Sequence, residues 1–308
     1  HFSKKKSLVS LVVIGNEPWE YSKTKYRDIL LGMSKGLKSN SVKLKVLPCA
    51  TQAYHKKEDI GNYISDYITK KNSAYIQGLN THVYSYVFDN NGNRIAVNPE
   101  DPRSEVWSVN NLMRFSESNL SGIPVYVTEF GYDSHGGGDD CTHSVCVSET
   151  TQAIYGVRMA LILYRLGVEQ FYWYYYANVD YTSMLHNRSG LTSSYSKGFQ
   201  KKKSFFSFQL LKENLGDFYF HDIIMENNDA YVYAYSDESG SIKRIIAWRP
   251  TLDNHDQNEG IEFPCSSVIE EVIPITNTSE SKTKTSYVRS VNNIRISLSG
   301  VPVIIKLK

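Results

Sequence analysis

The chain has 308 residues, 41% hydrophobic and 21% charged, an ordinary composition for one large globular domain or a medium domain with a small one. Its formal net charge is only +2, which gives no electrostatic reason to expect nucleic acid or an anionic membrane as a partner. No apolar stretch approaches the roughly 18 residues of a membrane-spanning helix, so none is predicted. The 23 Tyr are unusual. Tyr often lines carbohydrate sites, but it also favours strands, and most of these tyrosines are assigned to strands.

Strands and helices alternate over the first two-thirds of the chain. The run Leu8–Ile14 is almost continuously apolar, as is typical of a parallel strand buried on both faces. Four more strands are predicted at Val42–Leu47, Ile76–Val83, Pro124–Phe130 and Gln170–Tyr176. Helices are predicted at about Lys25–Lys38, Asp59–Lys71, Glu105–Glu117, Glu149–Leu166 and Lys203–Asn214, with loops at Asp89–Pro102 and Asp133–Val147. This alternation predicts α/β architecture with parallel strands.

From Phe218 onward the pattern changes to strands alone. They are predicted at Tyr231–Tyr235, Ile242–Trp248, Ser267–Ile275, Ser286–Val291, Ile294–Leu298 and Val301–Leu307. Turn-forming residues separate some of them, as in Asp253–Gly260. The pattern predicts an all-β module, a sandwich. We therefore expect two domains, residues 1–216 and 217–308.

Five parallel strands fit either an open doubly wound sheet or part of a (β/α)₈ barrel. An open sheet that binds nucleotides usually has a Gly-rich phosphate loop after its first strand, and Gly15-Asn16-Glu17-Pro18 is not such a loop. Barrel enzymes place catalytic residues at the carboxyl ends of strands, which is where this chain has its polar residues. The pattern favours the barrel.

Two glutamates, Glu17 and Glu129, lie at the carboxyl ends of predicted strands. An unpaired buried charge is unfavourable, so each must face a cavity, pair with a cation or be protonated. At equivalent ends of two strands the two side chains would converge on one cavity. Cleavage of a glycosidic bond uses such a pair, one as proton donor and one as nucleophile or base. The alternative is a structural ion pair for each glutamate.

The sequence around these glutamates resembles the carboxyl-terminal part of clan A glycoside hydrolases. In that clan an Asn-Glu-Pro motif ends strand four and supplies the acid/base, and a second Glu ends strand seven and is the nucleophile. The matching residues are Asn16-Glu17-Pro18 and Thr128-Glu129-Phe130-Gly131, with two strands between them. The resemblance implies strands four to eight of a (β/α)₈ barrel followed by a β-sandwich, which is more similar to families 39 and 30 than to a plain family 5 cellulase.

The resemblance also implies roles for neighbouring side chains. His82 and Tyr84 match the pair after strand six that hydrogen-bonds the nucleophile, and Asn16 would bond the sugar 2-hydroxyl. Trp173 lies on the candidate for strand eight, where the clan often places a Trp under the sugar. The implied substrate-binding residues are Asn16, Trp19, His82, Tyr84, Trp173 and Tyr175.

Strands one to three of such a barrel have no counterpart in the sequence. Half a barrel would leave an apolar sheet edge exposed. We therefore expect a second chain or a cleaved precursor fragment to supply these strands, together with the Arg that the clan usually carries after strand two.

The implied reaction is hydrolysis of a carbohydrate with retention and without a cofactor. Glu129 attacks the anomeric carbon while Glu17 protonates the leaving group, and Glu17 then activates water. Two alternatives stay open. One is a catalytically silent, glycan-binding or structural component of an extracellular assembly, and the other is a transglycosylase, which uses the same carboxylates.

The four cysteines divide into two kinds. Cys141 and Cys146 lie in a loop rich in Gly, Asp, Ser and Thr and could close a small local disulfide, whereas Cys49 and Cys265 fit buried free thiols. The same loop, Ser134–His143, contains two His and two Asp. A substrate-rim loop held by the disulfide is favoured there over a metal site, and no metal is predicted.

Three Asn-X-Ser/Thr triplets could accept N-linked glycans, at Asn119, Asn187 and Asn277. The sequence opens at His1 without Met, which suggests processing or trimming. Together with the possible disulfide, these features predict a secreted or cell-surface protein.

Overall fold

The computed structural model describes residues 9–17, 21–40, 43–51, 68–252, 255, 257–275 and 285–308. The chain divides into two compact units, each assembled from separate segments. The first unit comprises His1–Tyr84, Pro102–Phe130 and Leu166–Tyr174, and the second comprises Ser85–Asp101, Gly131–Arg165 and Tyr175–Lys308. Within the described ranges, no helix is long and apolar enough to cross a membrane.

The described residues of the first unit contain five strands: β1 (Leu11–Ile14), β2 (Lys45–Pro48), β3 (Leu79–Val83), β6 (Val125–Phe130) and β7 (Gln170–Trp173). β1 pairs with β2, β3 with β6 and β6 with β7, all in parallel. Two backbone N–H groups connect β2 to β3, because Gln77 donates to the carbonyl of Val46 and Thr51 to that of Asn80. The strands thus follow one another in chain order, and the prediction of parallel α/β architecture is confirmed.

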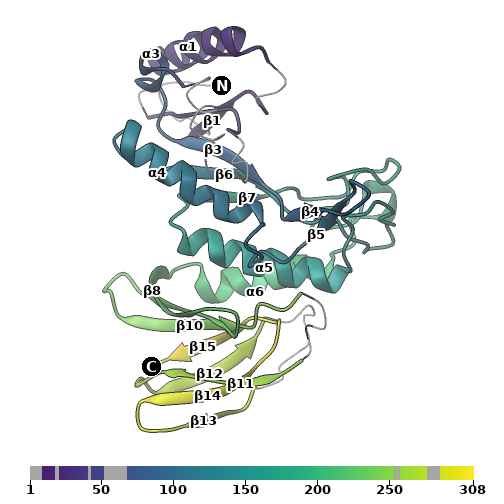
Figure 1. Ribbon diagram of the computed structural model, residues 1–308, viewed down its shortest axis with the longest axis vertical. Coiled ribbons are helices and arrows are strands. Elements are labelled where there is room, and N and C mark those ends of the chain that lie inside the picture. The colour runs from purple at the N-terminus through teal and green to yellow at the C-terminus, as the bar shows by residue number, and fades with distance from the viewer. Residues whose placement is uncertain are drawn as a thin grey trace. The chain divides into compact units, whose positions relative to one another are not determined.

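The described part of the first unit also contains the helices α1 (Lys23–Asn40), α3 (Lys70–Ser73) and α4 (Val109–Asn119) and the 3₁₀ helix η2 (Glu105–Ser108). α1 contacts β1 and β2, and α4 contacts β3 and β6 (Figure 1). The fully buried Tyr26 of α1 ties two strand ends together, since its hydroxyl donates to the carbonyl of Ile14 and accepts from the N–H of Cys49. Most of the predicted helix Asp59–Lys71 lies outside the described residues.

The second unit begins with a hairpin, β4 (Tyr86–Phe88) and β5 (Arg94–Ala96). β5 lies within the predicted loop Asp89–Pro102, so that prediction was wrong for these residues. The turn signals there mark the hairpin's own turn, in which the Asp89 carboxylate accepts the N–H groups of Asn91 and Asn93. Helices α5 (Glu149–Arg165) and α6 (Lys203–Leu215) pack against each other and confirm the two predicted helices.

Among the residues that the structure describes, eight strands follow α6: β8 (Tyr219–Glu226), β9 (Tyr231–Ser236), β10 (Ile242–Trp248), β11 (Glu259–Pro264), β12 (Ile269–Pro274), β13 (Tyr287–Arg289), β14 (Asn293–Leu298) and β15 (Val303–Leu307). They form two antiparallel sheets, in the orders β12-β15-β10-β9-β8 and β11-β14-β13. One buried apolar cluster contains residues of both sheets, among them Val232, Ile245, Phe263 and Ile296. β8 and β11 were not predicted.

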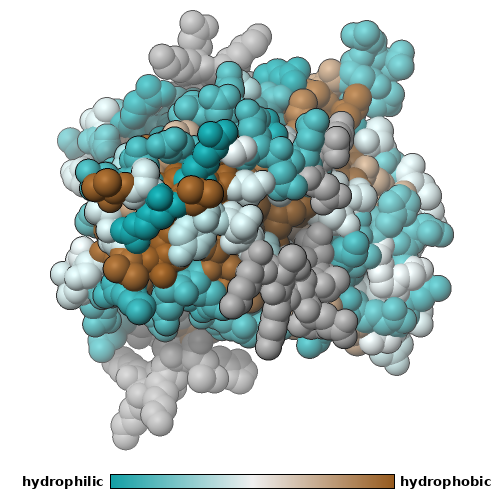
Figure 2. All heavy atoms as spheres, turned by 90° about the horizontal axis from the view of Figure 1, so that it is seen from below, coloured by the Kyte–Doolittle hydropathy of each residue, from teal (hydrophilic) through white to brown (hydrophobic). Residues whose placement is uncertain are grey.

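Apolar side chains also reach the surface of this all-β part. Val268, Val288 and Val291 are exposed. Figure 2, which views the molecule from below, shows brown hydrophobic side chains among teal hydrophilic ones on this face.

A buried charged pair joins three segments of the second unit. Arg158 of α5 is fully buried, and its Nε lies 2.7 Å from Oε1 of Glu100 while its Nη2 contacts the other carboxylate oxygen. The indole of Trp248, on β10, donates to the same carboxylate over 2.7 Å. Because removing one member would leave a buried charge unpaired, this network fixes the segment after β5 against α5 and β10.

Candidate active site

The polar face of β3 lies at the centre of the candidate site. Asn80 and His82 lie two positions apart, and Tyr84 follows at the same interval, so their side chains share one face. All five residues of β3 are buried. A polar side chain in a buried strand needs hydrogen-bonding partners, and those of β3 come from the neighbouring strands.

A β-bulge in β6 brings two of its residues to that face. Thr81 pairs with Val127 but His82 pairs with Glu129, which leaves Thr128 as an extra residue in β6. The Thr128 hydroxyl donates to Oδ1 of Asn80 over 2.7 Å. Thr128 and Glu129 therefore both meet the polar face of β3, whereas regular alternation would turn one of them away.

His82 brings the two glutamates together. Its Nδ1 lies 3.0 Å from Oε1 of Glu17 and 3.5 Å from Oε2 of Glu129. These distances set an upper limit of about 6.5 Å on the separation of the two oxygens, since both are measured from one atom. The His82 side chain is only 3% exposed and each glutamate side chain 20%, so the carboxylates keep a route to solvent. With both carboxylates ionised, Nδ1 must be the donor.

Tyr84 holds Glu129 from a second direction. Its hydroxyl donates to Oε2 of Glu129 over 2.8 Å. Its backbone N–H donates to the buried carboxylate of Glu105 in η2, also over 2.8 Å. The hydroxyl of Ser104 caps η2 by accepting the N–H of Val106, so the helix that positions Glu105 is itself fixed.

Burial dominates the electrostatics of this cluster. It raises the pKa of Glu129, and the Glu17 charge adds to that rise, while His82 and the Tyr84 hydrogen bond oppose it. Burial, together with the charge of Glu129, also raises the pKa of Tyr84 well above its ordinary value. Tyr84 therefore stays protonated and acts as a hydrogen-bond donor near neutral pH.

The other predicted substrate-binding residues occupy different surroundings. Asn16 is exposed directly after β1, and Trp19 lies outside the described residues. Trp173 packs edge-to-face on Phe130, with ring centroids 5.3 Å apart. Tyr175 belongs to the second unit, where its hydroxyl donates to the carbonyl of Asn187 over 3.3 Å. Their roles stay predictions.

Several residues of the site were missed by the sequence analysis. Asn80 and Thr128 are hydrogen-bonded to each other, and Glu105 accepts the backbone N–H of Tyr84. Tyr174 also belongs to this group, because its phenol interacts electrostatically with that of Tyr84. The period-two alternation of β3 could have indicated Asn80, but the bulge that turns Thr128 inward has no sequence signature of its own.

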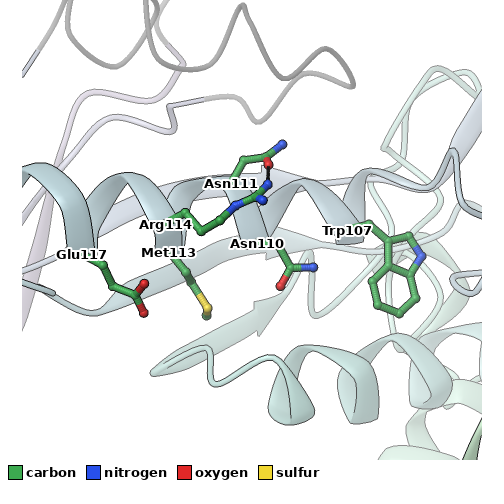
Figure 3. Close-up of a pocket in the computed structure, with 6 residues that line it drawn as sticks. All are labelled: Trp107, Asn110, Asn111, Met113, Arg114 and Glu117. Carbon is green, nitrogen blue, oxygen red and sulfur yellow. Dashed lines mark hydrogen bonds between the residues drawn. The ribbon is translucent and has the colours of Figure 1, made fainter.

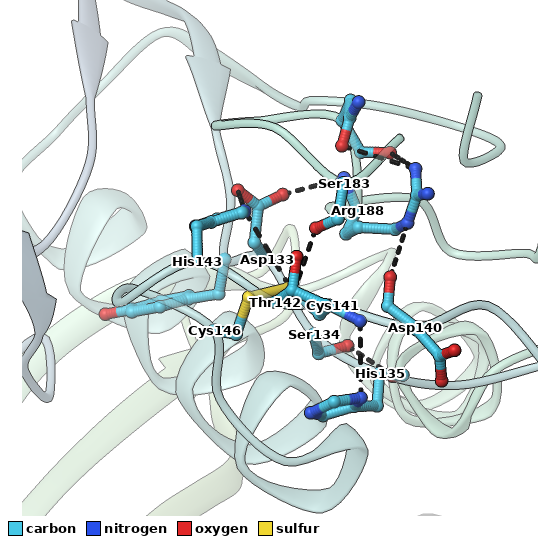
Figure 4. Close-up of a disulfide and its surroundings, with 12 residues drawn as sticks. Asp133, Ser134, His135, Asp140, Cys141, Thr142, His143, Cys146, Ser183 and Arg188 are labelled. Atoms are coloured by element: carbon cyan, nitrogen blue, oxygen red, sulfur yellow. Dashed lines mark hydrogen bonds and ion pairs between the residues drawn. A yellow bond between two sulfur atoms is a disulfide. The ribbon is translucent and has the colours of Figure 1, made fainter. Parts of the chain in front are cut away.

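The loop after β6 contains the expected disulfide between Cys141 and Cys146, whose Cα atoms are 5.8 Å apart (Figure 4). Cys49 and Cys265 are free and buried, as predicted. The His143 side chain lies near both disulfide cysteines. The cysteine sulfurs are bonded to each other, so they offer no thiolate to a metal ion. His143 instead contacts Asp133 over 3.1 Å.

The glycosylation triplets differ in their accessibility. Asn119 is exposed at the end of α4. Asn187 is buried, and its side chain both donates to the carbonyl of Thr182 and accepts the N–H of Met184. Asn277 lies outside the described residues. Asn119 is thus accessible in the folded protein, with one exposed hydrogen bond from its amide to the carbonyl of Phe115, whereas a glycan on Asn187 would displace these partly buried hydrogen bonds.

A separate hollow runs along η2 and α4 (Figure 3). Its lining residues are Trp107, Asn110, Asn111, Met113, Arg114 and Glu117. Glu117 is the one carboxylate among these lining residues, so the hollow does not provide the paired carboxylates that the β3 and β6 strand ends provide.

No family model matches this sequence, and no curated protein matches it either. Solved structures do match. A family 39 glycoside hydrolase from Bacteroides cellulosilyticus aligns over 96% of this chain and 57% of its own, with a TM-score of 0.69 and 16% identity. A family 51 α-L-arabinofuranosidase from Bifidobacterium longum aligns over 96% and 67%, with a TM-score of 0.64 and 12% identity.

A family 44 xyloglucanase from Paenibacillus polymyxa aligns over 97% of this chain and 66% of its own, with a TM-score of 0.60 and 13% identity. All three are clan A glycoside hydrolases with a (β/α)₈ barrel, so the resemblance inferred from the sequence is confirmed at the level of the fold. The chain spans little more than half the length of the family 39 structure.

Proposed function

We propose that the chain is the carboxyl-terminal part of a retaining glycoside hydrolase that cleaves O-glycosidic bonds in an oligo- or polysaccharide. The observation that carries the proposal is the placement of Glu17 and Glu129 against one nitrogen of His82. Retaining enzymes hold their carboxyl groups about 5–5.5 Å apart and inverting enzymes about 6.5–9.5 Å apart. The upper limit of 6.5 Å between the nearest oxygens supports retention.

Glu129 has the surroundings of a nucleophile. Tyr84 and His82 both favour its ionised form, the form that attacks, while burial limits its hydration. In the first step its carboxylate oxygen bonds to the anomeric carbon, the glycosidic C–O bond breaks, and Glu17 gives its proton to the leaving oxygen. In the second step Glu17 takes a proton from water, the hydroxide oxygen bonds to the anomeric carbon, and the ester to Glu129 breaks.

The substrate contacts are proposed from the resemblance to clan A glycoside hydrolases. Asn16 would bond the sugar 2-hydroxyl, and Trp19, Trp173 and Tyr175 would offer aromatic rings. The structurally similar proteins include an arabinofuranosidase, a xyloglucanase and an endoglucanase. A panel of aryl glycosides together with xyloglucan, arabinan and β-glucan is therefore the appropriate first screen.

The proposed architecture is strands four to eight of a (β/α)₈ barrel, residues 1–216, and a β-sandwich, residues 217–308. The parallel order β1-β2-β3-β6-β7 and the shared apolar cluster of the two antiparallel sheets support it. Three further strands would come from a preceding segment or a second chain. Secretion is proposed because disulfides such as Cys141–Cys146 persist in oxidising compartments.

The first test compares the wild type with Glu129→Gln on the substrate panel, using NMR to follow the anomeric configuration of the product. We expect hydrolysis with retention by the wild type and none by the variant. A mechanism-based glycosyl label should attach to Glu129. If wild type and variant are equally silent on every substrate, the chain is a glycan-binding or structural scaffold instead.

The two roles separate in a second test. Glu17→Ala should keep more activity on aryl glycosides with good leaving groups, which need no proton, than on poor ones. Azide should rescue it by replacing water in the second step, and should not rescue Glu129→Ala in the same way. Exchange of these two responses would reverse the assigned roles.

A further inference from the structure

A short hairpin in the second unit presents two aromatic rings to solvent. Thr192 and Lys201 form an antiparallel bridge, and the N–H of Ser193 donates to the carbonyl of Gln200 over 2.8 Å. The tip contains the 3₁₀ helix η3 (Tyr195–Lys197), and every residue from 195 to 200 is exposed. Tyr195 is 76% exposed and Phe199 46%, and their ring centroids lie 5.9 Å apart.

The backbone at Phe199 is strained. Its φ is 54°, directly after Gly198 with a φ of 74°, so two successive residues are left-handed. Glycine adopts this conformation readily, but a residue with a bulky side chain rarely does. Burial of the ring does not offset the strain, because nearly half of the side chain stays in solvent. Strain of this kind, when stability does not explain it, points to a functional role for the side chain.

A buried polar network holds the base of the hairpin in place. The Asp139 carboxylate accepts the N–H of Ser194 over 2.6 Å and its hydroxyl over 2.8 Å, and it also accepts the side-chain amide of Asn178 over 3.0 Å. Gly137 lies close against the base, since a Cβ there would be 2.5 Å from Cβ of Ser193. The rings are thus held on a fixed base.

We propose that Tyr195 and Phe199 form a platform that binds a carbohydrate chain, in addition to the site of Glu17 and Glu129. The C–H face of a sugar ring packs on an aromatic ring, and the exposed side chains of Ser196, Lys197 and Gln200 supply partners for its hydroxyls. This inference rests on the proposed function, and it extends the substrate to a chain of several sugars.

The size of the platform favours a sugar chain over a protein partner. Two aromatic side chains bury about 150–250 Å² each at most. A stable protein interface buries about 800 Å² on each partner. One sugar ring, in contrast, needs little more than one aromatic ring to stack on.

The test uses Phe199→Gly and Tyr195→Ala, with Tyr219→Ala as the matched control. Tyr219 is a similarly exposed tyrosine, 53%, on β8 outside the hairpin. Binding to xyloglucan, arabinan, xylan and β-glucan is measured by affinity electrophoresis and calorimetry. At least one polysaccharide should bind the wild type, and each platform variant should weaken it about five- to tenfold, while the control stays within twofold.

Phe199→Gly carries a second readout. Since glycine suits a φ of 54°, its melting temperature should equal or exceed that of the wild type while its affinity falls. Lost affinity with a lower melting temperature in both platform variants would indicate unfolding of the hairpin and overturn the proposal. Unchanged affinity, or no polysaccharide bound by the wild type, would also overturn it.

Failure of the platform and failure of catalysis are distinguishable. Polysaccharide binding is measured again in Glu129→Gln, which should bind like the wild type. Hydrolysis of aryl glycosides should be unchanged in the platform variants. If the protein hydrolyses glycosides but the platform variants bind polysaccharide as well as the wild type does, only the platform proposal is rejected. If the platform variants lose binding and the wild type hydrolyses nothing, only the catalytic proposal is rejected.

Discussion

Two carboxylates, the half-buried Glu129 in the first unit and the buried Asp133 in the second, are only four positions apart in the sequence and have opposite surroundings. Glu129 accepts one hydrogen bond from Tyr84, shares His82 with Glu17, and has a raised pKa because burial dominates. Burial also acts on Asp133, but hydrogen bonds outweigh it and lower the pKa. The donors to Asp133 are the His143 ring, the N–H groups of His186 and Arg188, and the Ser189 hydroxyl.

The difference separates a reactive carboxylate from a structural one. A carboxylate with every lone pair satisfied is stabilised as an anion and has little tendency to form a new bond. A carboxylate that is partly desolvated beside a second acid is poised for reaction. The distinction depends on the count and direction of donors, since desolvation acts to raise the pKa of both carboxyl groups.

The largest expected effect is on Glu129→Gln. Removing the nucleophile should lower kcat by about 10⁴-fold or more, by comparison with other covalent catalysts. The stability of this variant, unlike its kcat, should not fall. Because folding raises the pKa of Glu129, the ionised form destabilises the folded state, so near neutral pH the variant should melt at an equal or higher temperature. That gain should disappear as pH falls below the unfolded pKa, which thermal melts over a pH series would measure.

Asp133→Asn should show the converse behaviour. Replacing the anion leaves several buried donors poorly paired, which should destabilise the fold by about 3 kcal/mol. Since folding lowers the pKa of Asp133, this loss should be full at neutral pH and shrink as pH falls through the folded pKa. Denaturant titrations at two pH values measure it. An Asp133→Asn protein as stable as the wild type would contradict the structural role assigned to Asp133.

The sequence predicts those residues of the site that are marked by a signal in their own segment of the chain. Glu17 and Glu129 could be identified because an acid directly after an apolar run is unusual. His82 followed from the family resemblance, and the structure places it between both acids. Thr128 could not be predicted, because its orientation depends on a bulge formed only when β6 pairs with β3. Tyr174 was missed because strand ends on neighbouring elements, rather than sequence periodicity, bring it near Tyr84.

Prediction of the fold was likewise limited to elements that are marked by a signal in their own segment. Buried strands such as β6 and β10 were predicted from their apolar residues. β11 was missed because Gly260 and Pro264 resemble turn signals, although Ile261 and Phe263 alternate inward. Its pairing with β14 compensates for those residues. β8 is an edge strand with largely exposed residues, so its apolar pattern is weak.

The disulfide tests the structural side of the comparison, because His143, which contacts Asp133, lies between its two cysteines in sequence. Cys141→Ser/Cys146→Ser should lower the free energy of unfolding by roughly 2 kcal/mol, the loop-entropy value for so short a loop. A reductant should lower the melting temperature of the wild type and leave that of the double variant unchanged. An equal response in both proteins would show that the bridge does not stabilise the loop.

Tyr84→Phe tests the reactive side and should give the smallest effect. Loss of the 2.8 Å hydrogen bond removes a contact that favours ionised Glu129, so the pKa of Glu129 should rise further. The acid limb of kcat/KM should therefore move to higher pH, and the optimal rate should fall about tenfold, the equivalent of about 1.4 kcal/mol.

Tyr174→Phe is the matched control for this change. Tyr174 interacts with the phenol of Tyr84 and does not contribute to the shift of the Glu129 pKa, so the acid limb should move less than in Tyr84→Phe. Equal shifts in the two variants would mean that the general polarity of the cavity sets the pKa of Glu129. A shift confined to Tyr84→Phe would show that the directed Tyr84 donor, acting beside His82, helps to keep this half-buried carboxylate ionised, where Asp133 has several hydrogen-bond donors.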